Sequence, residues 1–295
     1  TTRVPLALLD EAWLAGRRVL VLEPRRIAAR MAAERMAAML GEKVGATVGL
    51  STRIDRRVSA KTRIEVVTDG LFTRRILSES DLAGIGAVLF DEFHERSLAA
   101  DLGLALARDV QGALREDLRL ILMSATLDVA RIAKSFEASV VESQGRSFPV
   151  ETVYLGKSAD PVEEQAARAV RRALREQAGS ALVFLPGMRE ILRTAERLAD
   201  LSGDVIIAPL YGALSPAEQD RAVAPARAGE RKVVIATDIA ESSLTIEGVS
   251  AVIDAGLSRV PDYDPDGVGA TLVTRRASRA SVDQRRGHAG RLSPG

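Results

Sequence analysis

The chain has 295 residues, 46% apolar and 27% charged, which indicates a globular protein long enough for two domains of ordinary size. Lys and Arg number 41 against 40 Asp and Glu, so a net charge of +1 excludes a globally basic surface and restricts any nucleic-acid site to a local patch. The chain has no cysteine, only two histidines and no apolar run near the ~20 residues of a membrane span, so we expect no disulfide, no histidine-built zinc site, no membrane partner and a cytoplasmic location.

Helix and strand patterns alternate through the first half of the chain. The expected elements are a helix over 6–15, a strand over 19–22, a helix over 27–40, strands over 45–50 and 63–67, a helix opening at Thr68-Asp69-Gly70, a strand over 85–90, a helix over 99–114 and strands over 118–123 and 139–142. Residues 144–149 then have the Gly, Ser and Pro content of a linker. We therefore predict one domain over residues 1–146 and a second over 147–295.

The same alternation restarts in the second half. The expected elements are helices over 161–177, 188–201 and 278–287, a helix that Ser215-Pro216 opens, strands over 181–185, 205–208, 233–236 and 249–253, and a β-hairpin over 257–274. The fold class is therefore α/β, with two tandem parallel-sheet domains and a hairpin in the second. The chain lacks a Met start and stops at Gly295 without a closing element, so we expect a fragment truncated at both ends.

The stretch Asp91-Glu92-Phe93-His94-Glu95-Arg96 directly follows the strand predicted over 85–90. Open α/β sheets bind ligands at the carboxyl ends of their strands. Of two adjacent carboxylates there, one can hold a hydrated metal ion while the other takes a proton from water. The alternative is a charged turn that only caps the strand, with His94 as an ordinary core histidine.

Several short motifs in this order resemble those of the DEAH-box superfamily 2 RNA helicases, and the resemblance covers essentially the whole chain. Asp91-Glu92-Phe93-His94 resembles the family's signature, with Phe93 in place of the usual Ala. The other matching motifs are Glu23-Pro24-Arg25-Arg26, Thr68-Asp69-Gly70, Ser124-Ala125-Thr126, the stretch 182–187, the stretch 237–246 and Gln284-Arg285-Arg286-Gly287-His288-Ala289-Gly290-Arg291. The Phe93 variant and the ending Arg-Leu-Ser-Pro-Gly are similar to the bacterial HrpB-type branch.

The resemblance implies two RecA-like domains, ATP as the substrate and Mg²⁺ as the metal. Asp91 would hold Mg²⁺ together with Thr1, Glu92 would polarise the attacking water, and Arg291 would act as the principal arginine finger. The implied catalytic residues are Asp91, Glu92, His94, Gln284, His288 and Arg291. The implied cofactor-binding residues are Thr1, Thr2, Arg35, Asp91, Ser124 and Thr126.

The resemblance also implies an RNA-binding face that contacts phosphates rather than reading sequence. Its residues are Arg25, Arg26, Thr68, Asp69, Gly70, Thr237 and Thr245. The hairpin around Asp264 to Gly267 resembles the element that these helicases use near the duplex junction. The plain alternatives are solvated helix-start charges for Arg25 and Arg26 and a simple surface hairpin over 257–274. Only 3% of the residues are aromatic, so base stacking is not expected to dominate RNA binding.

Three departures from the family pattern matter. Thr1 to Pro5 fit the residues after the Lys of a phosphate-binding loop, so we expect that loop to precede Thr1 and the chain alone to be inactive. His288 stands where relatives have a second Arg, which predicts a slower or more pH-dependent site. Arg35 matches a residue that stacks on adenine, or is a solvated helix charge, and its expected aromatic partner is Val223 here.

Three functions remain open on the sequence. The first is an ATP-driven helicase core that moves 3′ to 5′ on single-stranded or partly duplex RNA. The second is a DNA-directed translocase of the same superfamily. The third is a nucleic-acid-binding scaffold without turnover.

Overall fold

The computed structural model describes all residues except 1, 125–128, 144–147, 202, 204, 242–243, 245, 264–269 and 292–293. The chain divides into two compact units, Thr1–Val141 (unit 1) and Glu142–Gly295 (unit 2). The boundary predicted after residue 146 lies in a stretch outside the described residues, so the domain limits stay a prediction.

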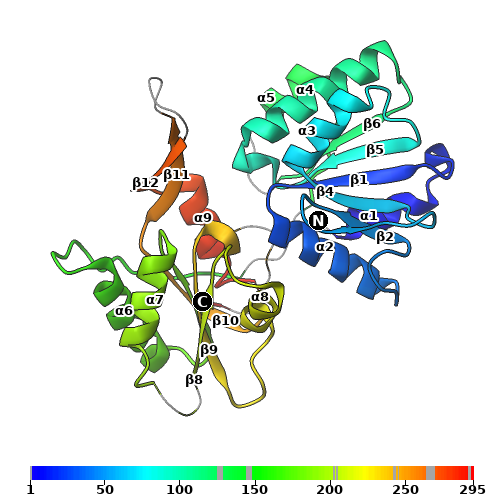
Figure 1. Ribbon diagram of the computed structural model, residues 1–295. Helices are drawn as coiled ribbons and strands as arrows, with labels where there is room; N and C mark the ends of the chain where they lie inside the picture. The colour runs from blue at the N-terminus through cyan, green and yellow to red at the C-terminus, as the bar shows by residue number, and fades with distance from the viewer. Residues whose placement is uncertain are drawn as a thin grey trace. The chain divides into compact units, whose positions relative to one another are not determined.

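Unit 1 is built on a six-stranded sheet with the spatial order β3-β2-β4-β1-β5-β6 (Figure 1). All neighbouring strands run parallel except β3, which pairs antiparallel with β2. The strands are β1 (Arg18–Glu23), β2 (Val48–Ser51), β3 (Arg56–Arg57), β4 (Ile64–Thr68), β5 (Ile85–Phe90) and β6 (Arg119–Leu122). Parallel strands are buried on both faces and therefore read as continuous apolar runs, as β5 does.

Helices cover both faces of this sheet (Figure 1). They are α1 (Arg3–Ala7), α2 (Arg26–Met39), α3 (Asp69–Ser78), α4 (Leu98–Ala113) and α5 (Val129–Phe136), with short 3₁₀ turns at Leu8–Asp10, Ala12–Leu14 and Phe93–Glu95. Along β1, Leu20 and Leu22 face the core under α3 and α4, whereas Val19 and Val21 face α2. Each such buried side chain contributes about 1.5–3 kcal/mol relative to an exposed one.

Unit 2 has a four-stranded parallel sheet in the order β10-β7-β9-β8 and a separate antiparallel hairpin, β11–β12 (Figure 1). The strands are β7 (Ser180–Phe184), β8 (Val205–Leu210), β9 (Arg231–Ala236), β10 (Val249–Asp254), β11 (Leu257–Tyr263) and β12 (Ala270–Arg276). The helices are α6 (Val162–Glu176), α7 (Met188–Arg197), α8 (Pro216–Val223) and α9 (Arg279–Gly287), with a 3₁₀ turn at Asp238–Ala240. The predicted fold class, two α/β units with parallel sheets and a hairpin in the second, is confirmed.

Local sequence signals explain where several helices begin. Ser215 caps α8 through a capping box with Glu218, and Pro216 takes the first helical position. Ser97 and Ser278 cap α4 and α9 through their hydroxyls.

Two predicted elements were wrong. The helix predicted over 6–15 breaks at Glu11, whose extended backbone (ψ 124°) turns the chain so that Leu14 becomes fully buried. Residues 139–142 form no strand, and Val140 and Val141 are exposed there. Among the described residues, no helix is long and apolar enough to cross a membrane.

Candidate functional site

The motifs of unit 1 meet along one edge of its sheet. β4, β1, β5 and β6 are consecutive parallel neighbours, so their carboxyl ends lie side by side. The strand register pairs Glu23 with Thr68, Leu22 with Phe90, and Phe90 with Leu122. This edge is where open α/β sheets bind ligands. The structure therefore brings the Arg25, Thr68, Asp91 and Ser124 segments together.

The turn after β5 is fixed to both neighbouring strands. The Asp91 amide donates to the Leu22 carbonyl at 3.1 Å, and the Phe93 amide donates to the Met123 carbonyl at 3.1 Å. Glu92 has a left-handed backbone (φ 47°), which costs a non-glycine residue roughly 1–2 kcal/mol. Such strain is found where the surrounding structure over-determines a functional turn.

Asp91 presents one buried carboxylate oxygen without a protein partner. Its Oδ1 accepts from the Glu92 amide at 2.9 Å, whereas Oδ2 is buried and accepts no hydrogen bond in the part of the chain that the structure describes. A buried carboxylate oxygen left in this way is costly unless a cation meets it. Asp91 therefore fits the role of a Mg²⁺ ligand.

No group of three His, Cys, Asp or Glu residues suited to a metal occurs in the described ranges. Mg²⁺ does not need such a group, since it keeps several waters and is usually bound through one or two carboxylates plus substrate phosphates.

Glu92, His94 and Ser124 form a connected group. The Nδ1 of His94 lies 3.5 Å from Glu92 Oε2 and 3.4 Å from Ser124 Oγ. The His94 side chain is only 5% exposed and that of Glu92 11%. His94 thus joins the turn after β5 to the end of β6. Thr126, which the resemblance also implies as a cofactor-binding residue, lies outside the described residues.

Asp69 has its carboxylate turned into the unit. Its Oδ2 accepts from Ser97 Oγ at 2.9 Å, and that same hydroxyl accepts from the Ala100 amide at the start of α4. Burial raises the pKa of Asp69 to about 6; the Ser97 hydrogen bond opposes this and the nearby Glu95 adds to it. Asp69 therefore joins α3 to α4. Its predicted RNA contact stays a prediction.

The other predicted residues of unit 1 take different positions. Arg26, Arg35 and Gly70 are exposed, and Thr2 and Thr68 are partly buried. Arg25 lies beside Glu95, with Nη2 3.3 Å from Oε2. Thr1 lies outside the described residues, so neither its proposed metal contact nor its ATP contact has a described position.

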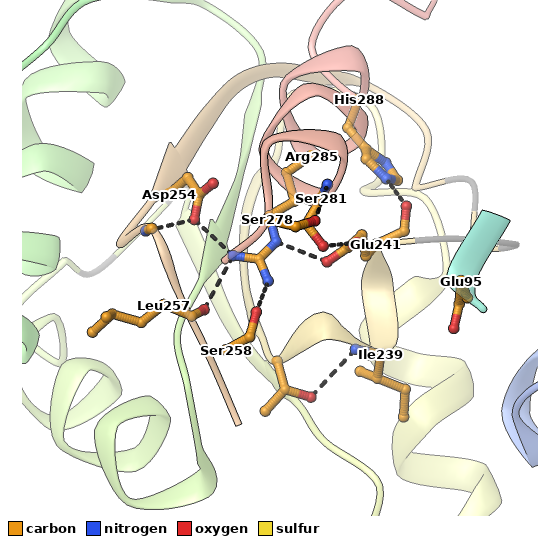
Figure 2. Close-up of polar contacts among 12 residues, drawn as sticks. Glu95, Ile239, Glu241, Asp254, Leu257, Ser258, Ser278, Ser281, Arg285 and His288 are labelled. Atoms are coloured by element: carbon orange, nitrogen blue, oxygen red, sulfur yellow. Dashed lines mark hydrogen bonds and ion pairs between the residues drawn. The ribbon is translucent and has the colours of Figure 1, made fainter. Parts of the chain in front are cut away.

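In unit 2, the motif at residues 284–291 is organised around Arg285, which is 1% exposed (Figure 2). Its Nε donates to Glu241 Oε2 at 2.9 Å, Nη1 to Asp254 Oδ1 at 2.9 Å and Nη2 to Ser258 Oγ at 2.6 Å. The guanidinium also lies over the Phe184 ring, 5.0 Å from its centroid. Arg285 thereby ties α9 to the ends of β7 and β10 and to the start of β11.

His288 is buried beside this network (Figure 2). Its Nε2 is 2.9 Å from the Glu241 carbonyl oxygen, and its ring lies 6.0 Å from that of Phe184. Burial lowers the pKa of His288 to about 4; Arg291 lowers it further, and the Glu241 contact opposes both. His288 is therefore neutral between pH 6 and 8, so the predicted pH-dependence through its titration is not supported by this environment.

The remaining predicted residues of unit 2 take different positions. Arg291 Nη1 donates to the Leu244 carbonyl at 3.0 Å, and Thr237 Oγ1 accepts from the Ile239 amide at 3.4 Å. Gln284 sits on α9, one residue before Arg285. Val223 is buried at the end of α8. Thr245 lies outside the described residues.

Sequence reasoning missed Arg285, Glu241 and Asp254 as members of the site. The available signal was weak: Arg285 and Glu241 stand inside recognised motifs, but 44 residues separate the pair. Asp254, at the end of a strand, carried no motif at all. Only the tertiary structure joins the three.

Comparison with known proteins agrees with this geometry. Residues 165–293 match the helicase conserved C-terminal domain family. The whole chain is 51% identical to the ATP-dependent RNA helicase HrpB of Escherichia coli, covering 37% of that protein, and 36% identical to the probable ATP-dependent RNA helicase DHR2 of Saccharomyces cerevisiae, covering 42%. The crystal structure of the E. coli DEAH/RHA helicase HrpB matches over the whole chain with a TM-score of 0.94, and the chain covers 38% of it.

The chain thus spans less than half the length of the curated relatives it matches. The fold that the chain shares with the matched structure places the motifs described above at the ends of its parallel strands. Residues 165–293 match the helicase conserved C-terminal domain family, and over its whole length the chain is similar to the DEAH/RHA helicase HrpB.

Proposed function

We propose that the chain forms the ATP-hydrolysing and RNA-tracking part of an ATP-driven RNA helicase that moves 3′ to 5′. The observation that carries this proposal is the turn after β5, where the unpartnered buried Oδ2 of Asp91 stands beside Glu92. RNA is proposed as the substrate because the relatives are named RNA helicases. The cytoplasm remains the expected compartment.

Asp91 and Glu92 divide the chemistry at the turn. The Asp91 carboxylate would hold the hydrated Mg²⁺ of Mg-ATP. When bound, that ion would neutralise charge developing on the phosphoryl oxygens. Glu92 orients the attacking water and accepts its proton, because its carboxylate is nearly buried and held close to His94.

Two residues of unit 2 are assigned the roles that the resemblance to the helicases gives them. Arg291 is the proposed arginine finger, whose guanidinium would stabilise transition-state charge, and Gln284 is the proposed water-orienting residue. His288 is neutral and buried, so it contributes no cation and instead packs against Phe184 and the Glu241 carbonyl. We therefore assign His288 a supporting role in place of the second arginine of relatives.

The residues proposed to contact RNA phosphates lie at strand ends within each unit. Arg25, Arg26, Thr68, Gly70 and Thr237 stand at or just after the ends of parallel strands, where hydroxyls, backbone amides and guanidinium groups can contact a backbone without reading bases. Such contacts predict a strong dependence of affinity on salt and little dependence on sequence.

The test is ATPase turnover by the full-length protein with and without single-stranded RNA. We expect RNA to raise turnover, and Glu92→Gln to lower kcat by roughly 10²-fold or more while ATP still binds, the range that general-base catalysis supplies. Asp91→Asn is expected to raise the Mg²⁺ concentration needed for half-maximal turnover. Asp160→Asn is the matched control, since its exposed pair with Arg168 lies in unit 2, outside the turn after β5.

The same assay separates the alternatives. Stimulation by single-stranded DNA but not RNA would favour a DNA-directed translocase. RNA binding with no turnover in the full-length protein would favour a binding scaffold. Turnover unaffected by Glu92→Gln would contradict the assigned site.

A further inference from the structure

Residues 148–151, which we call the entry segment, lie alongside the loop after α9 that carries Arg291. The Phe148 amide donates to the Gly290 carbonyl at 2.9 Å. Gly290 directly precedes Arg291, so this bond holds the main chain at the base of the proposed arginine finger. The residue after Phe148 is Pro149, whose ring restricts the backbone of both residues. The entry segment therefore has little backbone freedom to lose when it docks on the loop.

Two further backbone hydrogen bonds hold the same loop beyond Arg291. The Gly295 amide donates to the Pro149 carbonyl at 3.1 Å, and the Glu151 amide donates to the Gly295 carbonyl at 2.8 Å. One residue of the loop thus bonds two alternate residues of the entry segment, which is the pattern of a parallel strand pair. The entry segment therefore fixes the main chain on both sides of the proposed finger.

Gly290 and Gly295 allow the close packing of this loop. A Cβ at Gly290 would lie 2.6 Å from the Phe148 carbonyl oxygen and 2.7 Å from Val150 Cγ2. A Cβ at Gly295 would lie 2.7 Å from the Ala289 Cβ. Glycine is the residue that lets one backbone approach another this closely. A larger residue at either position would therefore displace the loop.

The turn after β9 supports the same loop through its side chains. His288 Nε2 lies 2.9 Å from the Glu241 carbonyl oxygen (Figure 2), and Arg291 Nη1 donates to the Leu244 carbonyl at 3.0 Å. The turn thus holds two side chains of the loop, whereas the entry segment holds its main chain. These are separate supports, and a substitution can remove one and leave the other.

We propose that the entry segment is a positioning element for Arg291 and acts through the Phe148 amide. Stabilisation of transition-state charge by a guanidinium depends on where that group stands, and a misplacement of about 1 Å can cost on the order of 10²-fold in rate. Because the main chain is already fixed at Gly290, the finger is held in place before ATP reacts. This inference rests on the function proposed above, in which Arg291 is the finger.

The test removes one backbone donor from the full-length protein. Phe148→Pro deletes the amide that donates to Gly290 and leaves the Pro149 carbonyl in place. Tyr154→Pro is the matched control, because Tyr154 is 91% exposed and its amide donates no backbone hydrogen bond within the described part of the chain. The measurements are kcat at saturating ATP and single-stranded RNA, KM for ATP and the melting temperature.

We expect Phe148→Pro to lower kcat roughly 10²-fold, the cost of a misplaced group. KM for ATP should stay within about twofold, because an interaction made in the transition state alone is lost from kcat. Tyr154→Pro should keep both values. Arg291→Ala should lower kcat by about 10³-fold or more. The double variant Phe148→Pro/Arg291→Ala should be no slower than Arg291→Ala, because no finger is then left to position.

Gly290→Ala tests the same contact from the side of the loop. The added Cβ meets the Phe148 carbonyl oxygen and should displace the loop from the entry segment. Well below its melting temperature, this variant should show the same fall in kcat and no further loss when combined with Arg291→Ala. It decides the question if Phe148→Pro does not fold.

Three results would overturn the inference: unchanged kcat in Phe148→Pro, an equal fall in Tyr154→Pro, or a further fall when Phe148→Pro is added to Arg291→Ala. The last result would mean that the entry segment only supports the fold of unit 2. All three leave the proposed function standing as long as Arg291→Ala is slow. Normal turnover in Arg291→Ala would instead remove the finger assigned in the proposed function, and this inference with it.

Discussion

The guanidinium of Arg25 lies against the carboxylate of Glu95, with Nη2 3.3 Å from Oε2. Arg25 follows β1 in a motif proposed to contact RNA phosphates, and Glu95 stands three residues after the proposed catalytic Glu92. Their side chains are 28% and 17% exposed, so the pair is only partly screened by water. A carboxylate and an RNA phosphate would therefore compete for the same guanidinium.

We predict that Glu95→Gln tightens binding of single-stranded RNA by roughly two- to fivefold, since one exposed-to-intermediate ion pair is worth about 0–1 kcal/mol. Arg25→Gln should weaken binding and reduce the slope of log K against log salt by about 0.7, the value for one phosphate contact on a single strand. Fluorescence anisotropy at several salt concentrations measures both.

Glu79→Gln is the control for that change, because Glu79 pairs with Arg75 on α3 in a comparable surface ion pair. It should leave RNA affinity unchanged. Weaker binding in Glu95→Gln would show that Glu95 orients Arg25 for RNA instead of competing with it.

Asp69 should make unit 1 less stable as the pH rises. Burial raises its folded-state pKa from 3.8 to about 6, so between these values the folded state holds more protons than the unfolded state. The stability that protonated Asp69 contributes is fully present below pH 3.8 and is lost as the pH rises through 6. Asp69→Asn removes this dependence and should raise the free energy of unfolding at pH 7 by up to about 3 kcal/mol.

Urea unfolding of the chain between pH 4 and 7 measures the Asp69 effect as the difference between Asp69→Asn and the unsubstituted protein. Ser97→Ala is the comparison, since it removes both the hydrogen bond to Asp69 and the cap of α4. It should destabilise the chain by about 1 kcal/mol. A difference that does not change with pH would show that Asp69 is not protonated in this range.

His288 should have the opposite dependence. Its folded-state pKa is lowered from 6.5 to about 4, so the unfolded state binds the extra proton between those values. The stability that neutral His288 contributes to the folded state is fully present above pH 6.5 and is lost as the pH falls through 4. His288→Gln lacks this titration. As the pH is lowered from 6.5 to 4, its free energy of unfolding should therefore fall less than that of the unsubstituted protein, by up to about 3 kcal/mol.

The same substitution tests the catalytic pH profile. Because His288 is neutral from pH 6 to 8, the shape of the ATPase profile in that range should be the same in His288→Gln and in the unsubstituted protein. An inflection near pH 7 that disappears in the variant would mean that His288 titrates during turnover, contrary to its buried position.

Two glycines of the same motif should respond differently to alanine. A Cβ at Gly290 would lie 2.6 Å from the Phe148 carbonyl oxygen and 2.7 Å from Val150 Cγ2, whereas a Cβ at Gly287 would meet no atom within 4 Å. Gly290→Ala should therefore destabilise the chain by about 1–3 kcal/mol through overpacking. Gly287→Ala, at the end of α9, should be neutral or stabilising by up to about 1 kcal/mol.

Urea unfolding of the two alanine variants measures this contrast directly. Equal stability in the two would mean that the 148–150 segment yields to the added methyl group. A large loss in Gly287→Ala alone would contradict the open space found at that position.

The sequence by itself determined most of the elements and the order of the strand-end motifs. Continuous apolar runs such as Ile85–Phe90 are typical of strands buried on both faces of a parallel sheet, and Ser215-Pro216 starts a helix through purely local hydrogen bonds. Since parallel strands end on the same edge, the placement of Asp91 beside Arg25, Thr68 and Ser124 followed from that pattern. Local chemistry was sufficient for these features.

Only the tertiary structure decided the environment of each side chain. The 44 positions that separate Glu241 from Arg285 leave no local trace of their ion pair, and burial is the largest cause of the lowered pKa of His288 and the raised pKa of Asp69. The break at Glu11 likewise came from the burial of Leu14 against the sheet, which overrode helical spacing. Desolvation and long-range packing depend on what surrounds a residue in space, and neighbours along the chain do not specify it.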